Sequence, residues 1–280
     1  MNAPLQHRVP APLLARRIQV LLAGAGGTGS RILEKLVCLH RGLLARGHPE
    51  GLMVTVMDPD CVAASNIGRQ AFYPGDVGAP KADVLVNRAN MALAGVCWRS
   101  VTQALDARTE LEDCDLVIGA VDQRAARLAI LQALQHCRSG RRYWLDCGNR
   151  VRDGQVVLGQ VGGGRDRCEP QARLPHVGEL YPELLNEAAD ADDEGPSCSL
   201  ADALERQSLC INAVLADLAV TLLWTLFTDG CIDSHGAFVN LQRMMVTPLR
   251  IDPQVWQRFG VRRGRGRAQC AQPRAVQRGQ

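Results

Sequence analysis

Four groups of residues stand in order along the first part of the chain, and their side chains have the chemistry of a nucleotide-phosphate site. They are a glycine-rich turn (Gly24, Gly26, Gly27 and Gly29), the triplet Asp58-Pro59-Asp60, the run Ser65-Asn66-Ile67-Gly68-Arg69-Gln70, and Lys81. Glycine lets backbone N–H groups approach a phosphate, and a helix that starts there adds partial positive charge. A glycine turn alone is weak evidence, because tight turns without ligands need glycine too.

The surrounding elements predict that these groups meet at one edge of a sheet. The apolar runs 18–23 and 52–57 are typical of buried strands, and a helical pattern starts at Thr28. Asp58 ends the second strand, where doubly wound folds hold the ribose hydroxyls. We expect a long helix end and loop over 40–51, because Asp58 lies further from the glycines than in the usual fingerprint. The alternative is that Asp58 is an ordinary acidic residue in the turn that ends the strand.

Lysine usage draws attention to Lys81. Of 32 Lys and Arg residues, only Lys35 and Lys81 are lysine. Lys35 fits the solvated face of a helix. Lys81 begins a predicted helix over 81–91, near the same sheet edge, where a compact ammonium serves a phosphate as a point charge. The alternative is that this lysine occurs by chance and has no role at a phosphate.

The run from Asp58 to Lys81 resembles the ThiF/MoeB family, whose members are relatives of the ubiquitin-activating enzymes. The resemblance rests on an aspartate that ends a strand, then Ser-Asn-x-x-Arg-Gln, then Asp-Val-Gly-x-x-Lys. Downstream, the segment 115–122 ends in Asp122 and is followed by Arg127, which is similar to the fourth strand of the family. The resemblance is strong over 17–158 and weaker over 198–225. The subtype that it suggests is the ThiF-type protein of the PRTRC system.

The resemblance implies an ATP-dependent adenylyltransferase that activates the C-terminal carboxylate of a small ubiquitin-like or sulfur-carrier protein and releases pyrophosphate. Such a carboxylate is ionised at neutral pH, so catalysis needs positioning and charge neutralisation rather than a general base. A homodimer is also implied. The implied roles are nucleotide binding by Gly24, Gly26, Gly27 and Gly29, ribose binding by Asp58, phosphate contacts by Asn66, Arg69, Gln70 and Lys81, and Mg²⁺ binding by Asp122.

Three further expectations depend on the same resemblance. Cys198 lies where some ThiF-like enzymes carry the cysteine that takes the activated partner, although a free cysteine is commonly a small apolar residue. The family's N-terminal arginine, which reaches the neighbouring subunit's site, has no clear motif here, and Arg8, Arg16 and Arg17 are the candidates. None of the 11 cysteines forms a Cys-x-x-Cys pair, so we expect no structural zinc.

The alternation of strands with helices predicts an α/β fold, with a doubly wound, Rossmann-like, mostly parallel sheet and antiparallel C-terminal additions. The last parallel strand is expected at 143–148 and the first antiparallel one at 155–161. We divide the chain into an ATP-binding Rossmann-like domain (1–165), a mobile acidic crossover loop (166–197), a C-terminal helix and strand region that completes the core or a dimer interface (198–260), and a basic disordered tail (261–280). Seven acidic and no basic residues over 178–195 favour the loop.

Composition is typical of a cytoplasmic globular enzyme. The 280 residues are 46% hydrophobic, and the net charge of +3 favours neither a membrane nor a nucleic acid, apart from weak contact through the basic tail. The apolar run 210–227 carries Asp217 near its middle, which favours a core helix over a bilayer span. No signal-peptide core is found in 1–17, and the irregular cysteines favour reduced thiols.

Two other function classes stay open. An NAD-dependent oxidoreductase would explain the glycine turn and Asp58, but not Arg69, Gln70, Lys81 or Asp122. A non-catalytic nucleotide-binding interaction module of a plasmid-type cassette would explain why the zinc and arginine motifs are missing.

Overall fold

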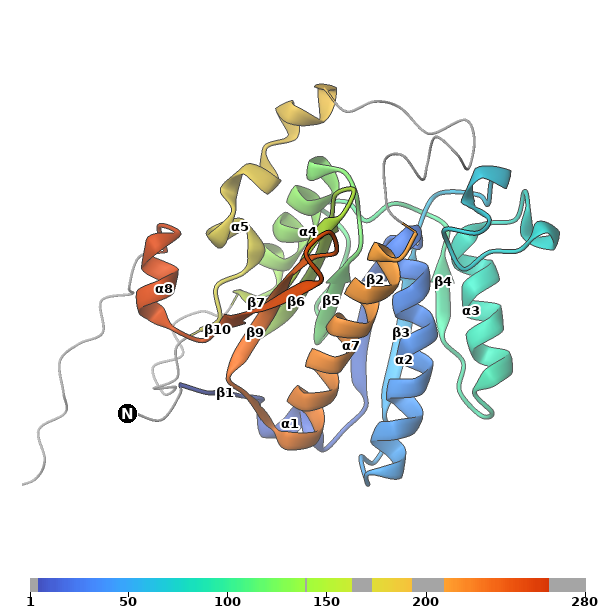
Figure 1. Cartoon of the computed structure of the whole chain (residues 1–280). Helices are drawn as coiled ribbons and strands as arrows, with labels where there is room; N and C mark the ends of the chain where they lie inside the picture. The colour runs from blue at the N-terminus through green and yellow to red at the C-terminus, as the bar shows by residue number, and fades with distance from the viewer. Residues whose placement is uncertain (1–4, 139, 163–172, 193–208, 262–280) are drawn as a thin grey trace, which may run out of the picture.

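A single eight-stranded sheet organises the chain, in the order β10-β9-β7-β6-β5-β2-β3-β4. The computed structural model describes residues 5–138, 140–162, 173–192 and 209–261. Five neighbouring strands of the sheet run parallel, and the remaining three are added antiparallel at one end (Figure 1). The parallel strands are β4 (Arg99–Val101), β3 (Leu52–Met57), β2 (Ile18–Ala23), β5 (Leu116–Gly119) and β6 (Arg141–Asn149), and the antiparallel ones are β7 (Asp153–Gly162), β9 (Ser234–Asn240) and β10 (Met245–Arg250). The predicted fold class is therefore confirmed.

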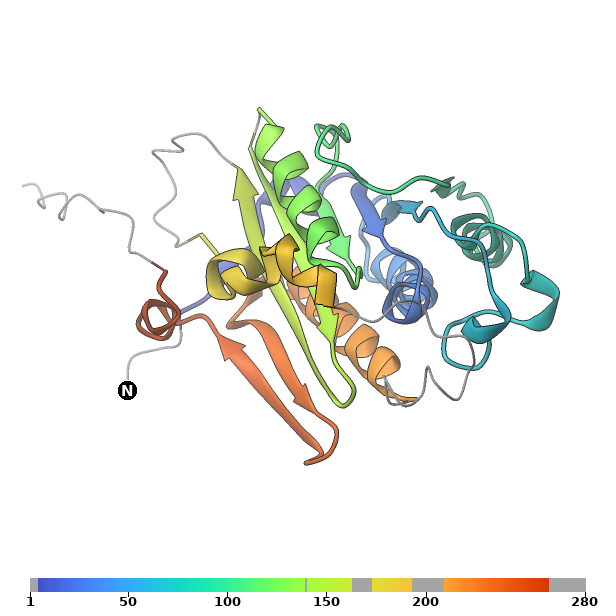
Figure 2. The same ribbon diagram turned by 90° about the horizontal axis from the view of Figure 1, so that it is seen from above.

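Helices cover both faces of this sheet, as a doubly wound fold requires. Alternate residues of β6 point to opposite faces: Asp146 contacts α4 (Arg124–His136), whereas Asn149 contacts α7 (Ile211–Asp229). Helix α2 (Gly27–Ala45) lies beside α7, and α3 (Lys81–Ala92) packs near the β3–β4 edge (Figures 1 and 2). Shorter elements are β1 (His7–Arg8), which pairs with β8 (Cys231–Ile232), together with α1 (Ala11–Leu14), η1 (Ala64–Asn66), η2 (Pro74–Asp76) and α8 (Pro253–Arg258).

Burial on both faces explains the apolar runs that were predicted as strands. Strands β2 and β3 have the bounds expected from the sequence, 18–23 and 52–57. In β6, all six residues from Tyr143 to Gly148 are buried. A strand covered by helices on both faces carries a continuous apolar run rather than an alternating one, which makes its bounds easy to recognise.

The acidic segment differs from the mobile loop expected over 166–197. Its described part, 173–192, forms α5 (Val177–Leu180), η3 (Pro182–Leu185) and η4 (Glu187–Asp192). Val177 and Leu180 are buried. The carboxylate of Asp190 accepts hydrogen bonds from the Arg124 and Ala125 N–H groups at the start of α4. Apolar burial and a charge at a helix N-terminus hold this segment against the domain.

Helix α7 is long and apolar enough, by length and composition, to cross a bilayer. It packs instead beside α2 and against β6, β7 and β9, and Leu215, Ala219 and Leu223 are fully buried. Asp217 pairs with Lys35 of α2 across the outer surface of the two helices, at 2.6 Å. These contacts are those of a core helix, which the sequence also predicted.

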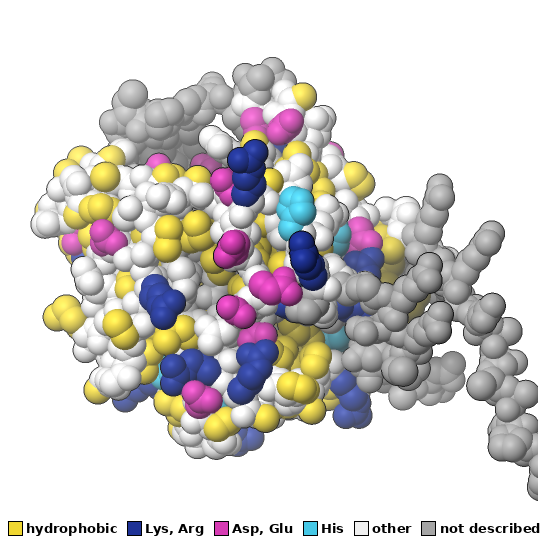
Figure 3. Space-filling model, turned by 180° about the vertical axis from the view of Figure 1, so that it is seen from behind, with side chains coloured by type: hydrophobic (Ala, Val, Ile, Leu, Met, Phe, Trp, Pro, Cys, Tyr) yellow, Lys and Arg dark blue, Asp and Glu magenta, His cyan; other side chains and the backbone are white. Residues whose placement is uncertain are grey.

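The surface seen from behind mixes charges of both signs (Figure 3). Acidic and basic side chains lie near one another on this face, with hydrophobic side chains between them. Such a face has no extended field of one sign, in keeping with the small net charge of +3.

A buried histidine joins α8 to the sheet. His235 Nδ1 donates to the Leu158 carbonyl oxygen at 2.8 Å, and the Trp256 indole N–H donates to His235 Nε2 at 3.1 Å. One nitrogen must therefore carry a proton and the other a lone pair, which defines a neutral ring. Burial lowers the pKa of His235 to about 4, and burial likewise lowers the pKa of His7 to about 4.

We predict that acid destabilises this protein between pH 6.5 and 4 through these histidines. In this range the unfolded chain takes up protons that the folded chain does not, so the free energy of unfolding falls with pH by up to about 1.4 kcal/mol per pH unit for each group. His235→Asn keeps a donor for Leu158 but cannot be protonated, so it should reduce the slope by about one proton. Denaturant unfolding at several pH values measures the slope, and an unchanged slope in the variant would contradict the assignment.

Candidate nucleotide site

Most of the residues that the sequence predicted line a cavity of about 320 Å³ at the carboxyl edge of the parallel strands. The cavity lies beside the ends of β2, β3 and β5. Strand β2 has β3 on one side and β5 on the other, so the strand order reverses here, and doubly wound folds bind ligands at such a switch point. Its described lining includes Gly24, Gly26, Gly27, Thr28, Asp58, Asp60, Arg69, Gln70, Lys81, Leu105, Val121, Asp122, Gln123, Cys147, Asn149 and Asn212.

The glycine turn is built by close backbone approaches that no other residue permits. Gly24 has φ +92°, and a Cβ atom there would lie 2.6 Å from the Ala120 carbonyl oxygen. A Cβ atom at Gly29 would lie 1.9 Å from the Gly24 carbonyl oxygen. At Gly26, by contrast, no atom lies within 4 Å of the Cβ position. Gly24 and Gly29 therefore shape the turn, whereas Gly26 leaves space for a ligand at the N-terminus of α2.

Two aspartates connect the glycine turn to Lys81. The Asp58 carboxylate accepts hydrogen bonds from Ala25 N–H at 2.5 Å and from Asp60 N–H at 2.9 Å. Burial raises the pKa of Asp58, and these hydrogen bonds and the nearby Lys81 oppose that effect. Asp60 in turn holds the Lys81 ammonium at 2.7 Å, with the Lys81 side chain almost fully buried and the Asp60 carboxylate exposed. Lys81 thus points into the cavity in a fixed position.

Arg69 and Gln70 line the cavity from the loop after η1. Burial lowers the pKa of Arg69, and the negative charge of Asp122, which lines the same cavity, opposes this shift. Gln70 is buried, and its Oε1 accepts no hydrogen bond from the described residues. Asn66 does not line the cavity. Its Oδ1 accepts the Ala63 N–H at 2.9 Å and so closes η1, and the loop that carries Arg69 and Gln70 follows η1.

Asp122 follows β5 and is held by a buried ion pair. Arg127 donates from Nε to Asp146 Oδ1 at 3.0 Å and from Nη1 to the Asp122 carbonyl oxygen at 3.2 Å. Asp146 is completely buried, which raises the pKa of its carboxyl, and Arg127 opposes the shift. Removing one partner of such a pair leaves an uncompensated buried charge. The backbone at Asp122 is therefore fixed by two residues outside the cavity surface that a ligand would touch.

The charges that line the cavity suit a divalent cation together with phosphates. The described lining carries two cations, Arg69 and Lys81, and three carboxylates, Asp58, Asp60 and Asp122, so its formal charge is 2 − 3 = −1. Mg²⁺ is usually held by one or two carboxylates plus substrate phosphates, so a single Asp122 is enough on the protein side. Among the described residues no cluster of three or more His, Cys, Asp or Glu side chains forms a metal site of its own.

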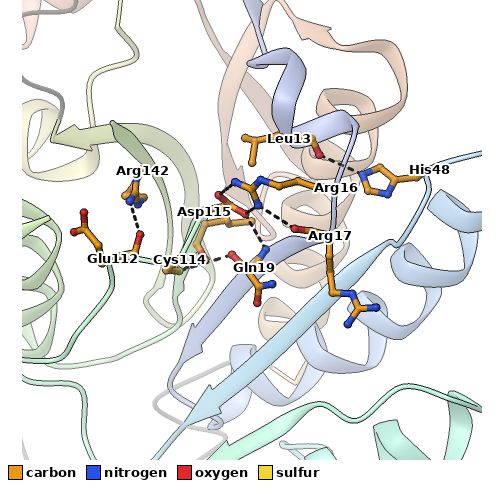
Figure 4. Close-up of polar contacts among 10 residues, drawn as sticks. Leu13, Arg16, Arg17, Gln19, His48, Glu112, Cys114, Asp115 and Arg142 are labelled. Atoms are coloured by element: carbon orange, nitrogen blue, oxygen red, sulfur yellow. Dashed lines mark hydrogen bonds and ion pairs between the residues drawn. The ribbon is translucent and has the colours of Figure 1, made fainter. Parts of the chain in front are cut away.

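Of the described residues that the sequence predicted, Gly29, Arg16 and Arg17 lie outside the cavity lining, as Asn66 does. Gly29 packs against the turn from behind, and Cys198 lies outside the described residues. At the opposite, amino edge of the sheet, Arg16 forms a two-pronged ion pair with Asp115, with both N–O distances at 2.7 Å (Figure 4). Arg17 pairs with Glu50 at 3.2 Å. These two candidates for a trans-acting arginine are thus engaged within their own chain.

The sequence did not identify several residues of the lining. Asp60 follows Asp58 by two positions, and its role at Lys81 was not recognised. Asn149 and Asn212 come from β6 and α7, and they are joined by a hydrogen bond of 3.0 Å. Cys147 also lines the cavity, but burial raises its pKa so far that the thiol stays protonated at neutral pH. It lacks the thiolate form that a nucleophile requires.

Comparison with known proteins identifies the family. A model of the ThiF family matches residues 13–254, so the chain belongs to the ThiF family. Among solved structures, PaaA superposes with a TM-score of 0.55 at 15% identity, over 84% of this chain and 64% of PaaA. MccB of E. coli with ATP gives a TM-score of 0.54 at 14% identity, over 84% and 64% of the two chains. The complex of E. coli MccB with AMPCPP and MccA gives a TM-score of 0.54 at 14% identity, over 84% of this chain and 65% of MccB. The chain thus spans less than two thirds of these proteins, and the likeness shows a shared fold.

We predict that alanine at two glycines of the turn has different effects on the free energy of unfolding and on nucleotide binding. Gly29→Ala places a methyl group against the Gly24 backbone and should lower the free energy of unfolding by about 1–3 kcal/mol, the usual cost of overpacking. Gly26→Ala meets no atom and should leave stability within about 0.5 kcal/mol of wild type, while its methyl group narrows the cavity and weakens nucleotide binding. Chemical denaturation and nucleotide titration of both variants test this prediction. Equal free energies of unfolding for Gly26→Ala and Gly29→Ala would contradict the close approach of Gly29 to the Gly24 backbone.

Proposed function

We propose that this chain is an adenylyltransferase that activates the C-terminal carboxylate of a small protein or peptide with ATP. A carboxylate oxygen of the partner attacks the α-phosphorus, the bond to the β-phosphate oxygen breaks, and an acyl-adenylate and pyrophosphate result. The attacking group is already ionised at neutral pH, so the protein has no proton to remove. Its task is to orient the two reactants and to neutralise the phosphate charge.

The observation that carries the proposal is the convergence of Lys81 and Arg69 on the cavity beside the glycine turn. Asp58 lies at the end of β3, where a ribose is held in doubly wound folds. The open space at Gly26, next to the first N–H groups of α2, suits a phosphate. An NAD-dependent oxidoreductase has no use for Lys81, Arg69 and Asp122 on the phosphate side. Membership of the ThiF family supports the same choice.

Asp122 is the residue that would hold Mg²⁺ at this site, and the ion would supply neutralisation of phosphate charge. Arg127 fixes the backbone of Asp122, and Lys81 and Arg69 supply the protein's own positive charge. Gln70 offers a buried amide oxygen and its N–H₂ group to the same cavity. The chain's residues thereby bind and orient the nucleotide, while a partner's carboxylate supplies the nucleophile.

The identity of the acceptor and several other specific assignments are also part of the proposal. The acceptor is a ubiquitin-like or sulfur-carrier protein; among the proteins that share this fold, E. coli MccB has a structure together with MccA. We further assign the protein to the PRTRC system, a homodimeric state, a cytoplasmic location and a role of Cys198 as acceptor of the activated partner. Eight cysteines of the described chain are free thiols, which suits a reducing compartment.

We predict that Lys81→Ala and Arg69→Ala each lower the rate of adenylation by about 100-fold or more, because each removes one preorganised charge from the phosphates. The measurement is exchange of labelled pyrophosphate into ATP, with a small protein ending in Gly-Gly as acceptor. Lys35→Ala is the matched control, since Lys35 is the other lysine of the chain and pairs with Asp217 outside the cavity. Its rate should equal that of wild type.

Two outcomes would overturn the adenylyltransferase. Near wild-type exchange in both cavity variants would show that Lys81 and Arg69 do not act on the phosphates. Binding of Mg-ATP without exchange, over a panel of acceptors with free C-termini, would favour a nucleotide-dependent interaction module. Tighter binding of NAD than of ATP, measured by calorimetry, would favour an oxidoreductase.

A further inference from the structure

The first turn of α7 meets the first turn of α2 at the floor of the cavity. The two helices run side by side along one face of the sheet (Figure 1). At their meeting point lies Asn212, which is 2% exposed. Its Oδ1 accepts hydrogen bonds from the Thr28 hydroxyl at 2.9 Å and from Asn149 Nδ2 at 3.0 Å. One amide thus joins α7, α2 and β6, and all three side chains line the cavity.

The Asn212 amide lies with its oxygen toward Thr28 and Asn149. The Thr28 hydroxyl and Asn149 Nδ2 both donate to this Oδ1 atom, so the amide nitrogen points the other way. The nitrogen then lies over the glycine turn, because a Cβ atom at Gly27 would be 2.5 Å from Nδ2 and 2.8 Å from Cγ. Only glycine at this position lets the amide lie directly on the backbone.

We infer that Asn212 is a positioning residue that holds the glycine turn in the shape that receives the nucleotide phosphates. This inference rests on the proposed function. The first N–H groups of α2 have no partner within the helix and are the groups that face a phosphate. Asn212 fixes them from behind by fastening Thr28 to β6 through Asn149. Without the amide, the buried Thr28 hydroxyl loses its acceptor and the turn loses its lateral support.

Asn212 also brings a distant part of the chain to the nucleotide. It is 184 positions from Thr28 and stands in the second position of α7, shortly after the segment that contains Cys198. A change in the start of α7 can therefore reach the phosphate turn through the Asn212 side chain. The Asp58 contacts to Ala25 hold the turn from the β3 side, so Asn212 is its support from the opposite side.

The test is a double-mutant cycle of Asn212→Ala and Thr28→Val in the full chain, with two measurements. The first is hydrogen exchange of the Ser30 amide, which donates to the Gly26 carbonyl oxygen at 3.0 Å and so reports the order of the turn in the nucleotide-free protein. The second is the dissociation constant of Mg-ATP. Asn212→Ala should speed Ser30 exchange and weaken Mg-ATP about tenfold. The double variant should be no worse than Asn212→Ala, because residues that act through one contact are not additive.

Controls separate this role from general packing. Thr225→Val removes a hydroxyl of α7 that donates to the Thr221 carbonyl oxygen far from the cavity, and it should change neither measurement. Asn212→Asp keeps the acceptor oxygen for Thr28, so Ser30 should stay protected while the new negative charge weakens Mg-ATP. Asn212→Asp thus tests the turn even if Asn212→Ala does not fold.

The outcomes distinguish this inference from the proposed function. Loss of Mg-ATP binding in Lys81→Ala, with unchanged binding in Asn212→Ala, overturns the role of Asn212 alone. Additive effects of Asn212→Ala and Thr28→Val, or unchanged Ser30 exchange, also overturn it. Faster exchange without weaker Mg-ATP binding would make Asn212 purely structural. A wild-type protein that does not bind Mg-ATP overturns the proposed function and this inference with it.

Discussion

The site depends on one close approach, that of the first turn of α2 to the end of the turn that follows β2. The Gly24 carbonyl oxygen occupies the place where any side chain at Gly29 would begin. This contact sets how far the start of α2 reaches over the sheet edge. Gly24 N–H donates to the Met57 carbonyl oxygen, and Ala25 N–H donates to the Asp58 carboxylate, so the same turn also fixes the end of β3. The position of the Asp58 carboxylate and the orientation of the first N–H groups of α2 therefore follow from one packing constraint.

From this turn the rest of the cavity is assembled by short connections. Asp58 accepts the Asp60 N–H, Asp60 holds Lys81, and Lys81 opens α3. Each link is a hydrogen bond or ion pair between residues two to about twenty positions apart. Because the links are local, they can be recognised as a pattern in the sequence. The spacing from Asp58 to Lys81 predicted that both residues would lie at the same sheet edge, and both line the cavity.

The parts of the molecule that were not predicted depend on contacts between distant segments. Asn212 carries no local signal, because its partners Thr28 and Asn149 come from other elements. The acidic segment was misjudged for a similar reason. The prediction was based on the number of acidic residues and did not consider the buried apolar pair Val177 and Leu180. In addition, the charge of Asp190 is offset by the N-terminus of α4, which is near Asp190 only in the folded chain. Strand bounds in the parallel half were predictable since burial on both faces gives an apolar run with a clear end.

The charge of the cavity constrains how a nucleotide enters it. Because the described lining carries a formal charge of −1, attraction of a polyanion does not come from an excess of basic side chains. Under the proposed function it comes from local groups: the N–H groups at the start of α2, the Lys81 ammonium held by Asp60, and a divalent cation that Asp122 would hold. The Asp60–Lys81 pair leaves the ammonium two further donors, so a phosphate adds to the pair without breaking it. Under the proposed function, the nucleotide therefore binds together with Mg²⁺. A site of this kind favours the metal-bound triphosphate over simple anions, because an anion without the cation meets three carboxylates and only two positive side chains.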